Sequence, residues 1–94
     1  MTFATGRVTV STTGVPLVSN EAERCDIGIQ IYSSSGNTGD VYIGNSTGVT
    51  ADSSDTTDGY PIAPNTSLLV TDRNPNEIFA ISESGAQKLW YIIV

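Results

Sequence analysis

Apolar and polar residues alternate along most of this chain, with the period of two that is typical of β-strands. The alternation is clearest in residues 7–11 and 25–31, and in the second segment Cys25, Ile27, Ile29 and Ile31 fall on one face. Further strands are predicted at residues 40–44, 67–71, 77–82 and 87–94. A weaker candidate covers residues 15–18, because Pro16 has no N–H and fits only an edge strand or the start of a strand.

Turn signals separate these segments. Residues 34–39 are rich in Ser, Gly and Asn, and residues 84–86 predict a tight hairpin before the last strand. Pro64 and Asn65 predict a type II turn, in which Pro fixes φ and Asn takes the left-handed position. The only helical signal is a single turn at residues 20–23.

This pattern predicts an all-β fold. Six to eight short, mostly antiparallel strands in 94 residues indicate one β-sandwich or small β-barrel, jelly-roll-like, that spans residues 1–94. Residues 1–6 are expected either to form an N-terminal arm or to cover one end of the barrel, with Phe3 as the apolar contact.

Composition narrows the function classes. Four basic and ten acidic residues give a net charge of −6, which argues against nucleic acid and an anionic membrane surface as partners. The chain has no His and one Cys, so the commonest general base, an internal disulfide and a Cys-based zinc site are excluded. The start of the chain does not resemble a signal peptide, and no segment is apolar for long enough to span a membrane.

Few residues are candidates for chemistry. Asp52, Asp55 and Asp58 lie three apart in a long loop and could offer oxygen ligands to Ca²⁺, but they lack the EF-hand spacing, and a solvated acidic loop is the favoured interpretation. Glu77 and Glu83 lie at opposite ends of one predicted strand, too far apart to favour a glycosidase pair. Cys25 has no activating His and is expected to be a buried apolar residue. We therefore expect no catalytic residues, no metal and no cofactor, and hence no enzyme.

The C-terminal strand carries a different signal. Residues 89–94 are apolar on both faces, whereas a two-layer sandwich buries only one face of each sheet. The strand is either central with Trp90 half exposed, or one of its faces packs against another subunit. The 20-residue loop between Asn45 and Pro64 is a second unusual feature, because long loops in compact domains are often functional.

Residues 37–50 and 59–64 resemble a group of small β-domains found in tailed-bacteriophage virion proteins. The likeness rests on the strand Val41-Tyr42-Ile43-Gly44, the following Gly48-Val49-Thr50 and a turn that contains Pro64, and it continues through residues 77–82 and 85–88. It covers residues 20–94. The chain departs from the group at Asn65, where Gly is usual, and in the inserted segment 51–58.

The resemblance implies a structural virion protein, specifically a capsid decoration (cement) protein. Such a protein is made in the host cytoplasm and binds the major capsid protein on the outer surface of the shell, often as a homotrimer. On this hypothesis the seam between subunits uses either Trp90 and Ile92 or the opposite face of the strand, Leu89, Tyr91 and Ile93. Thr2, Phe3 and Arg7 are then expected to reach the capsid. The alternatives are a tail, neck or fibre component, and a carbohydrate-binding module in which Tyr60 and Trp90 supply the sugar platform.

Overall fold

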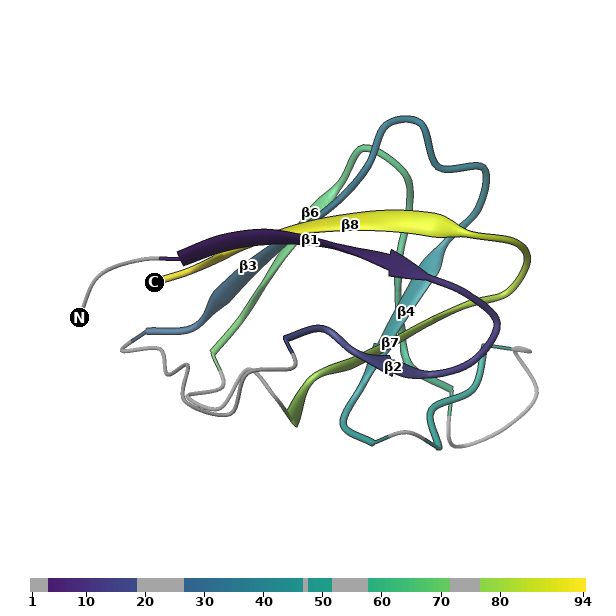
Figure 1. The fold of residues 1–94 in the computed structure, drawn as a ribbon, viewed down its shortest axis with the longest axis horizontal. Helices are drawn as coiled ribbons and strands as arrows, with labels where there is room; N and C mark the ends of the chain where they lie inside the picture. The colour runs from purple at the N-terminus through teal and green to yellow at the C-terminus, as the bar shows by residue number, and fades with distance from the viewer. Residues whose placement is uncertain (1–3, 19–26, 47, 52–57, 72–76) are drawn as a thin grey trace.

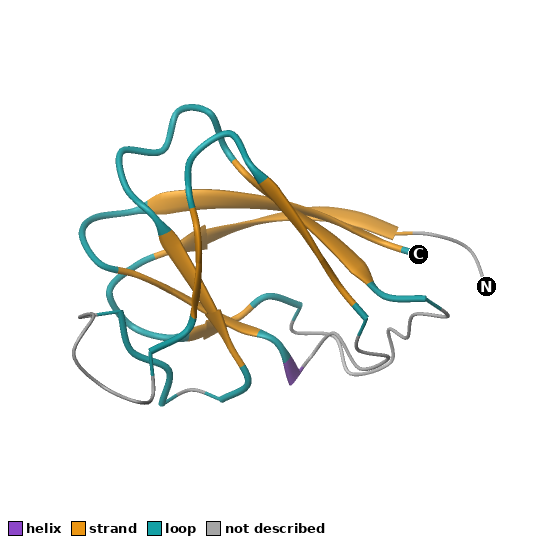
Figure 2. Cartoon of the chain, turned by 180° about the vertical axis from the view of Figure 1, so that it is seen from behind, coloured by secondary structure: helices purple, strands orange, loops and turns teal. Residues whose placement is uncertain are grey.

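Eight strands form two four-stranded antiparallel sheets that pack face to face in the computed structural model of the protein (Figure 1). The structure describes residues 4–18, 27–46, 48–51, 58–71 and 77–94. The connections between strands lie at the two ends of the layers (Figure 2). The predicted all-β, jelly-roll-like fold is confirmed.

The strand order is that of a jelly roll. The strands are β1 (Ala4–Val10), β2 (Val15–Pro16), β3 (Ile29–Ser33), β4 (Val41–Gly44), β5 (Tyr60–Ile62), β6 (Ser67–Val70), β7 (Phe79–Ser82) and β8 (Gln87–Ile93). Sheet A has the order β1-β8-β3-β6 and sheet B the order β2-β7-β4-β5. Consecutive strands alternate between the sheets except at β4–β5, so the chain crosses repeatedly from one layer to the other, as two Greek keys require.

The core fills the space between the sheets and explains the alternation in the sequence. Ile29 and Ile31 of β3 and Leu89 and Ile93 of β8 are fully buried on the inner face of sheet A. They pack against a set of buried residues from sheet B and its flanks: Val41, Ile43, Ile62, Ile78 and Ala80. Because every second residue of each strand points inward, one face of each sheet supplies most of this core, and Leu17, Val18 and Ile78 beside the strands supply the rest.

A second, smaller cluster lies on the outer face of sheet B. Tyr42 of β4 and Ile81 of β7 pack there against Val49 and Ala51 from the segment after β4, with Phe79 at the margin. Gly44 permits this cover, because a Cβ at its position would lie 2.7 Å from the Cβ of Val49. Sheet B is therefore covered on both faces by its own chain.

The structure corrects two expectations from the sequence. Ile27 was assigned to the buried face of a strand, but it is 62% exposed, because β3 begins at Ile29 and Gly28 already pairs with Val94 at the sheet end. Residues 45–64 were expected to be one long loop, yet Tyr60–Ile62 forms β5 beside β4. Its three residues, with a central Pro, carry too little alternation to signal a strand.

Two turns have the backbone conformation that the sequence predicts. Asn65 has φ 63 and Gly85 has φ 66, so both occupy the left-handed region expected of them. Residues 4–6 were expected either to belong to an N-terminal arm or to cover one end of the barrel, but they belong to β1 and pair with β8. Met1, Thr2 and Phe3 lie outside the described residues. The helical turn at residues 20–23 and the buried position expected for Cys25 also fall outside them.

Candidate functional site

The outer face of sheet A is not covered by any described part of the chain. The ladders align its side chains in two rows across four strands. One row contains Arg7, Trp90, Tyr32 and Ser67, and the other contains Thr5, Ile92, Gln30 and Leu69. We call this surface, together with Thr9 and Lys88, the Trp90 face.

Trp90 is the centre of this face. Its side chain is 46% exposed although it lies on β8, an inner strand of the sheet. The guanidinium of Arg7, directly across the ladder, lies 5.3 Å from the centroid of the indole ring. A cation over an exposed indole contributes about 0.5–1 kcal/mol and restricts the motion of both side chains. Trp and Arg are also the residue types most enriched in the energetic centres of protein interfaces.

A shallow groove of about 370 Å³ runs beside Trp90. Tyr32 and Ile92 form part of its apolar wall, and Gln30 contributes the amide. The Tyr32 hydroxyl donates a hydrogen bond of 2.7 Å to Oδ1 of Asn65, so the turn after β5 fixes the position of the ring. The groove thus has rigid aromatic walls on strands rather than on loops, which suits a preorganised contact.

Charge is distributed unevenly around the molecule. Arg7 and Lys88 are the basic residues within the described ranges, and both lie on the Trp90 face. The strands of sheet A contain no acidic residue. In a chain with net charge −6 this face therefore combines apolar and cationic side chains, whereas the acidic residues of the described ranges lie elsewhere.

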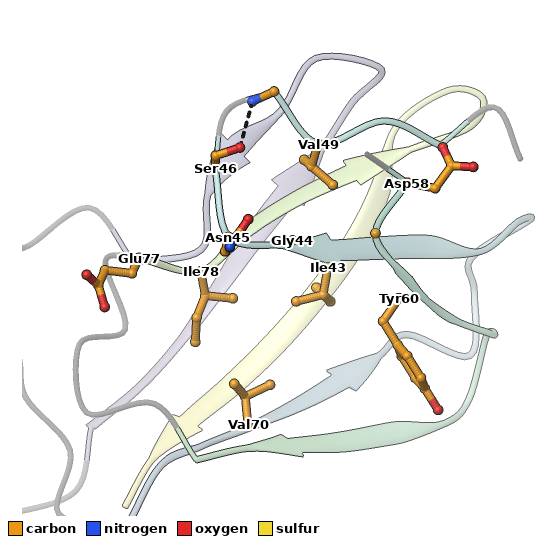
Figure 3. Close-up of a pocket in the computed structure, with 12 residues that line it drawn as sticks. Ile43, Gly44, Asn45, Ser46, Val49, Asp58, Tyr60, Val70, Glu77 and Ile78 are labelled. Atoms are coloured by element: carbon orange, nitrogen blue, oxygen red, sulfur yellow. Dashed lines mark hydrogen bonds between the residues drawn. The ribbon is translucent and has the colours of Figure 1, made fainter. Parts of the chain in front are cut away.

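A second hollow, of about 500 Å³, opens between β4, β5 and the end of β6 (Figure 3). Ile43, Val70 and Ile78 form its apolar floor, so it reaches the edge of the main core. Its acidic side chains do not converge: Asp58 accepts a 2.7 Å hydrogen bond from the Thr50 hydroxyl, while Glu77 points away at the opposite end (Figure 3). This arrangement provides no acid–base pair and no ligand set for a cation.

The described residues that the sequence offered for catalysis or metal binding do not form a site. Glu77 and Glu83 are exposed and flank opposite ends of β7. Among the described residues no group of three or more His, Cys, Asp and Glu side chains could hold a metal ion. Asp52, Asp55 and Cys25 lie outside the described ranges. No helix in the part of the chain that the structure describes has the length and apolar character needed to cross a membrane.

The structure separates the predicted subunit-contact residues by face. Leu89 and Ile93 are 0% exposed and belong to the core, and Tyr91 points inward beneath Gly6. Trp90 and Ile92 are on the outer face. Of the two faces that the sequence left open, only that of Trp90 and Ile92 is available to a partner, because the other fills the sandwich.

Residues from two separate predictions lie together on the Trp90 face. Arg7 was assigned to a capsid-binding arm and Trp90 to a seam between subunits, yet they are ladder neighbours in one sheet. Sequence reasoning did not identify Gln30, Leu69 and Lys88 as part of the same surface. Alternation places each of them on one face of its own strand, but only the sheet order, which is non-local, brings the strands together.

Comparison with known proteins adds no assignment, since no family model, curated protein or solved structure matches this chain.

Proposed function

We propose that this protein is a structural component of a virus particle, a capsid decoration protein that binds the major capsid protein on the outer surface of the shell as a homotrimer. The observation that carries the proposal is the Trp90 face, a rigid sheet surface with an exposed indole, a stacked guanidinium and apolar neighbours. The resemblance of residues 20–94 to phage virion β-domains supplies the class of particle.

The Trp90 face has the composition of a protein contact. An exposed aromatic and arginine centre with both apolar and polar neighbours is typical of the core and rim of an interface. The cations Arg7 and Lys88 favour an acidic, apolar patch on the partner. Because several copies of a trimer bind one lattice at once, a modest affinity for each copy yields strong overall attachment.

The sugar-platform alternative is less well supported by the positions of its aromatic residues. Trp90 lies on the outer face of sheet A, whereas Tyr60 is on β5, an edge strand of sheet B. The two residues named for the platform therefore do not share one surface. A tail, neck or fibre component differs from a decoration protein mainly in copy number.

Copy number is the first test. Quantitative mass spectrometry of purified virions should give about one chain, or one third, per major capsid subunit. A few copies per particle would move the protein to the tail, neck or fibre, and absence from the particles would contradict the proposal.

The second test concerns the Trp90 face. Trp90→Ala should reduce capsid occupancy about tenfold or more in a binding titration with capsids that lack the protein, since loss of an interface centre costs upwards of about 1.4 kcal/mol. Tyr60→Ala is the matched control, because Tyr60 is an aromatic that is 65% exposed but lies on sheet B. Equal occupancy for both variants would show that the Trp90 face is not the contact.

A further inference from the structure

The edges of the two sheets differ in how they are protected against pairing with another strand. Sheet B ends in β2, two residues that include Pro16, and in β5, three residues centred on Pro61. Short strands and Pro are common devices that block edge-to-edge association. Sheet A ends in β1, seven residues without Pro, and in β6, four residues without Pro or charge.

The hydrogen-bond pattern shows which backbone groups on β1 point outward. Gly28 and Val94 exchange both of their N–H···O bonds, at 3.2 and 2.9 Å, and the continuous ladder carries this alternation along β8. Trp90 and Ile92 therefore direct their backbone groups toward β3, and Leu89 and Tyr91 direct theirs toward β1. The ladder partners of Leu89 and Tyr91 are Val8 and Gly6, which leaves the N–H and C=O groups of Thr5, Arg7 and Thr9 directed away from the sheet.

The same argument applies to β6. Ser33 donates its N–H to the carbonyl of Thr66 at 2.8 Å and accepts from the N–H of Asn65 at 2.9 Å, so its backbone groups point toward β6. By alternation Leu68 and Val70 face β3. The N–H and C=O groups of Ser67 and Leu69 are directed away from the sheet.

We propose that the β6 edge of one copy of this chain pairs with the β1 edge of the next, in antiparallel orientation, so that sheet A continues from copy to copy. The proposal deepens the proposed function only in the number of copies. A head-to-tail junction closes into a ring when the turn from copy to copy is a simple fraction of a circle, and the trimer expected there requires a turn of about 120°. The pairing itself depends on the two edges and not on any capsid.

Three features of the fold favour this pairing. All three ladders of sheet A are antiparallel, so β1 and β6 run in opposite directions, and copies repeated in the same orientation bring them together as an antiparallel pair. The outward-directed residues of both edges have their side chains on the outer face, so the Trp90 faces of neighbouring copies lie on the same side of the continued sheet. One junction also satisfies both edges of sheet A that the described residues leave unpaired, whereas a twofold β1–β1 contact satisfies only β1.

The geometry is compatible with the Trp90 face acting as a docking surface. Edge pairing adds strands in the plane of the sheet and does not stack anything on its faces.

Amide hydrogen exchange tests the junction directly. At a concentration at which the protein has the mass of three chains, the amides of Thr5, Arg7, Thr9, Ser67 and Leu69 should be protected. On dilution to the monomer they should lose this protection, while the amides of Val8 and Leu89 stay slow. A monomer at every concentration, or an oligomer in which the Ser67 and Leu69 amides exchange fast, would overturn the proposal.

Proline variants provide a second, independent measurement. Thr9→Pro and Leu69→Pro each remove an outward N–H without removing a bond inside the sheet, and each should abolish the trimer in sedimentation velocity. Thr9→Ala and Leu69→Ala keep the N–H and are the matched controls, and circular dichroism reports whether each variant is folded.

Mixing the two proline variants distinguishes head-to-tail from twofold pairing. Each variant retains one intact edge, so an equimolar mixture should form a complex of two chains that neither forms alone. An assembly of Leu69→Pro alone that equals the wild type would show that β6 takes no part, and would overturn the proposal. Neither result depends on capsid binding, so failure here and failure of the proposed function are separate outcomes.

Discussion

Sheet A and sheet B solve the same packing problem on their inner faces but differ on their outer faces. The outer face of sheet B is covered by Val49 and Ala51 over Tyr42 and Ile81, and its edges are short and contain Pro. The outer face of sheet A carries the exposed Trp90 with the Arg7 guanidinium over its ring, and its edges are open among the described residues. The described part of the chain thus covers the outer face of one sheet and leaves that of the other uncovered.

The largest expected effect separates the two faces of a single strand, β8. Leu89→Ala should lower the free energy of unfolding by about 2–5 kcal/mol, because Leu89 is fully buried between the sheets and its removal leaves a cavity. Trp90→Ala, at the next residue but on the outer face, should cost less than about 1 kcal/mol. Urea denaturation of the monomer, followed by far-ultraviolet circular dichroism, measures both.

The reverse order of these two values would contradict the assignment of faces. A large loss in both variants would mean that Trp90 is part of the core, and the proposed contact surface would then not exist.

An intermediate effect tests how sheet B is closed. Gly44→Ala should destabilise the protein by about 1–3 kcal/mol, because the new Cβ would overlap Val49 and push the covering segment away from the sheet. Gly48→Ala is the matched control in the same segment: its Cβ would meet only Ser46 Oγ, at 3.6 Å, and should have little effect.

Combining Gly44→Ala with Val49→Ala sharpens this test. Removal of the Val49 methyl groups relieves part of the overlap. The double variant should therefore lose less free energy of unfolding than the sum of the losses in the two single variants. Strict additivity would show that Gly44 and Val49 are not in contact, and that another part of the chain covers sheet B.

Sequence and structure agree where the signal is local. The strands with clear alternation are present, and Asn65 has the positive φ that a Pro-Asn turn requires. The sequence could not anticipate β5, because Tyr60-Pro61-Ile62 forms a strand only through its pairing with β4. Ile27 shows the opposite failure, since its alternation continues beyond the end of the sheet.

At the candidate site, too, the sequence predicted local features but not the contacts between distant strands. The sequence left open whether residues 89–94 form a central strand with Trp90 half exposed or use one face for another subunit. The structure shows a central strand with Trp90 46% exposed. The sequence could not decide between the faces of Trp90 and Leu89, because period two is symmetric until the core side is known. It also could not place Arg7 beside Trp90, because β1 and β8 lie at opposite ends of the chain and meet only through the sheet order.

The smallest expected effect concerns how the Trp90 face is held ready for a partner. A double-mutant cycle with Arg7→Met and Trp90→Leu should give a coupling free energy of about 0.5–1 kcal/mol, because the guanidinium lies 5.3 Å from the indole centroid on an exposed surface. Lys88→Met in place of Arg7→Met is the control, since Lys88 lies on the same face but is not Trp90's ladder partner on β1. A coupling near zero for both cations would mean that Arg7 does not restrain the ring in solution. The Trp90 ring on sheet A would then lack a restraint from its ladder neighbour, whereas Tyr42 and Ile81 on sheet B are packed against Val49 and Ala51.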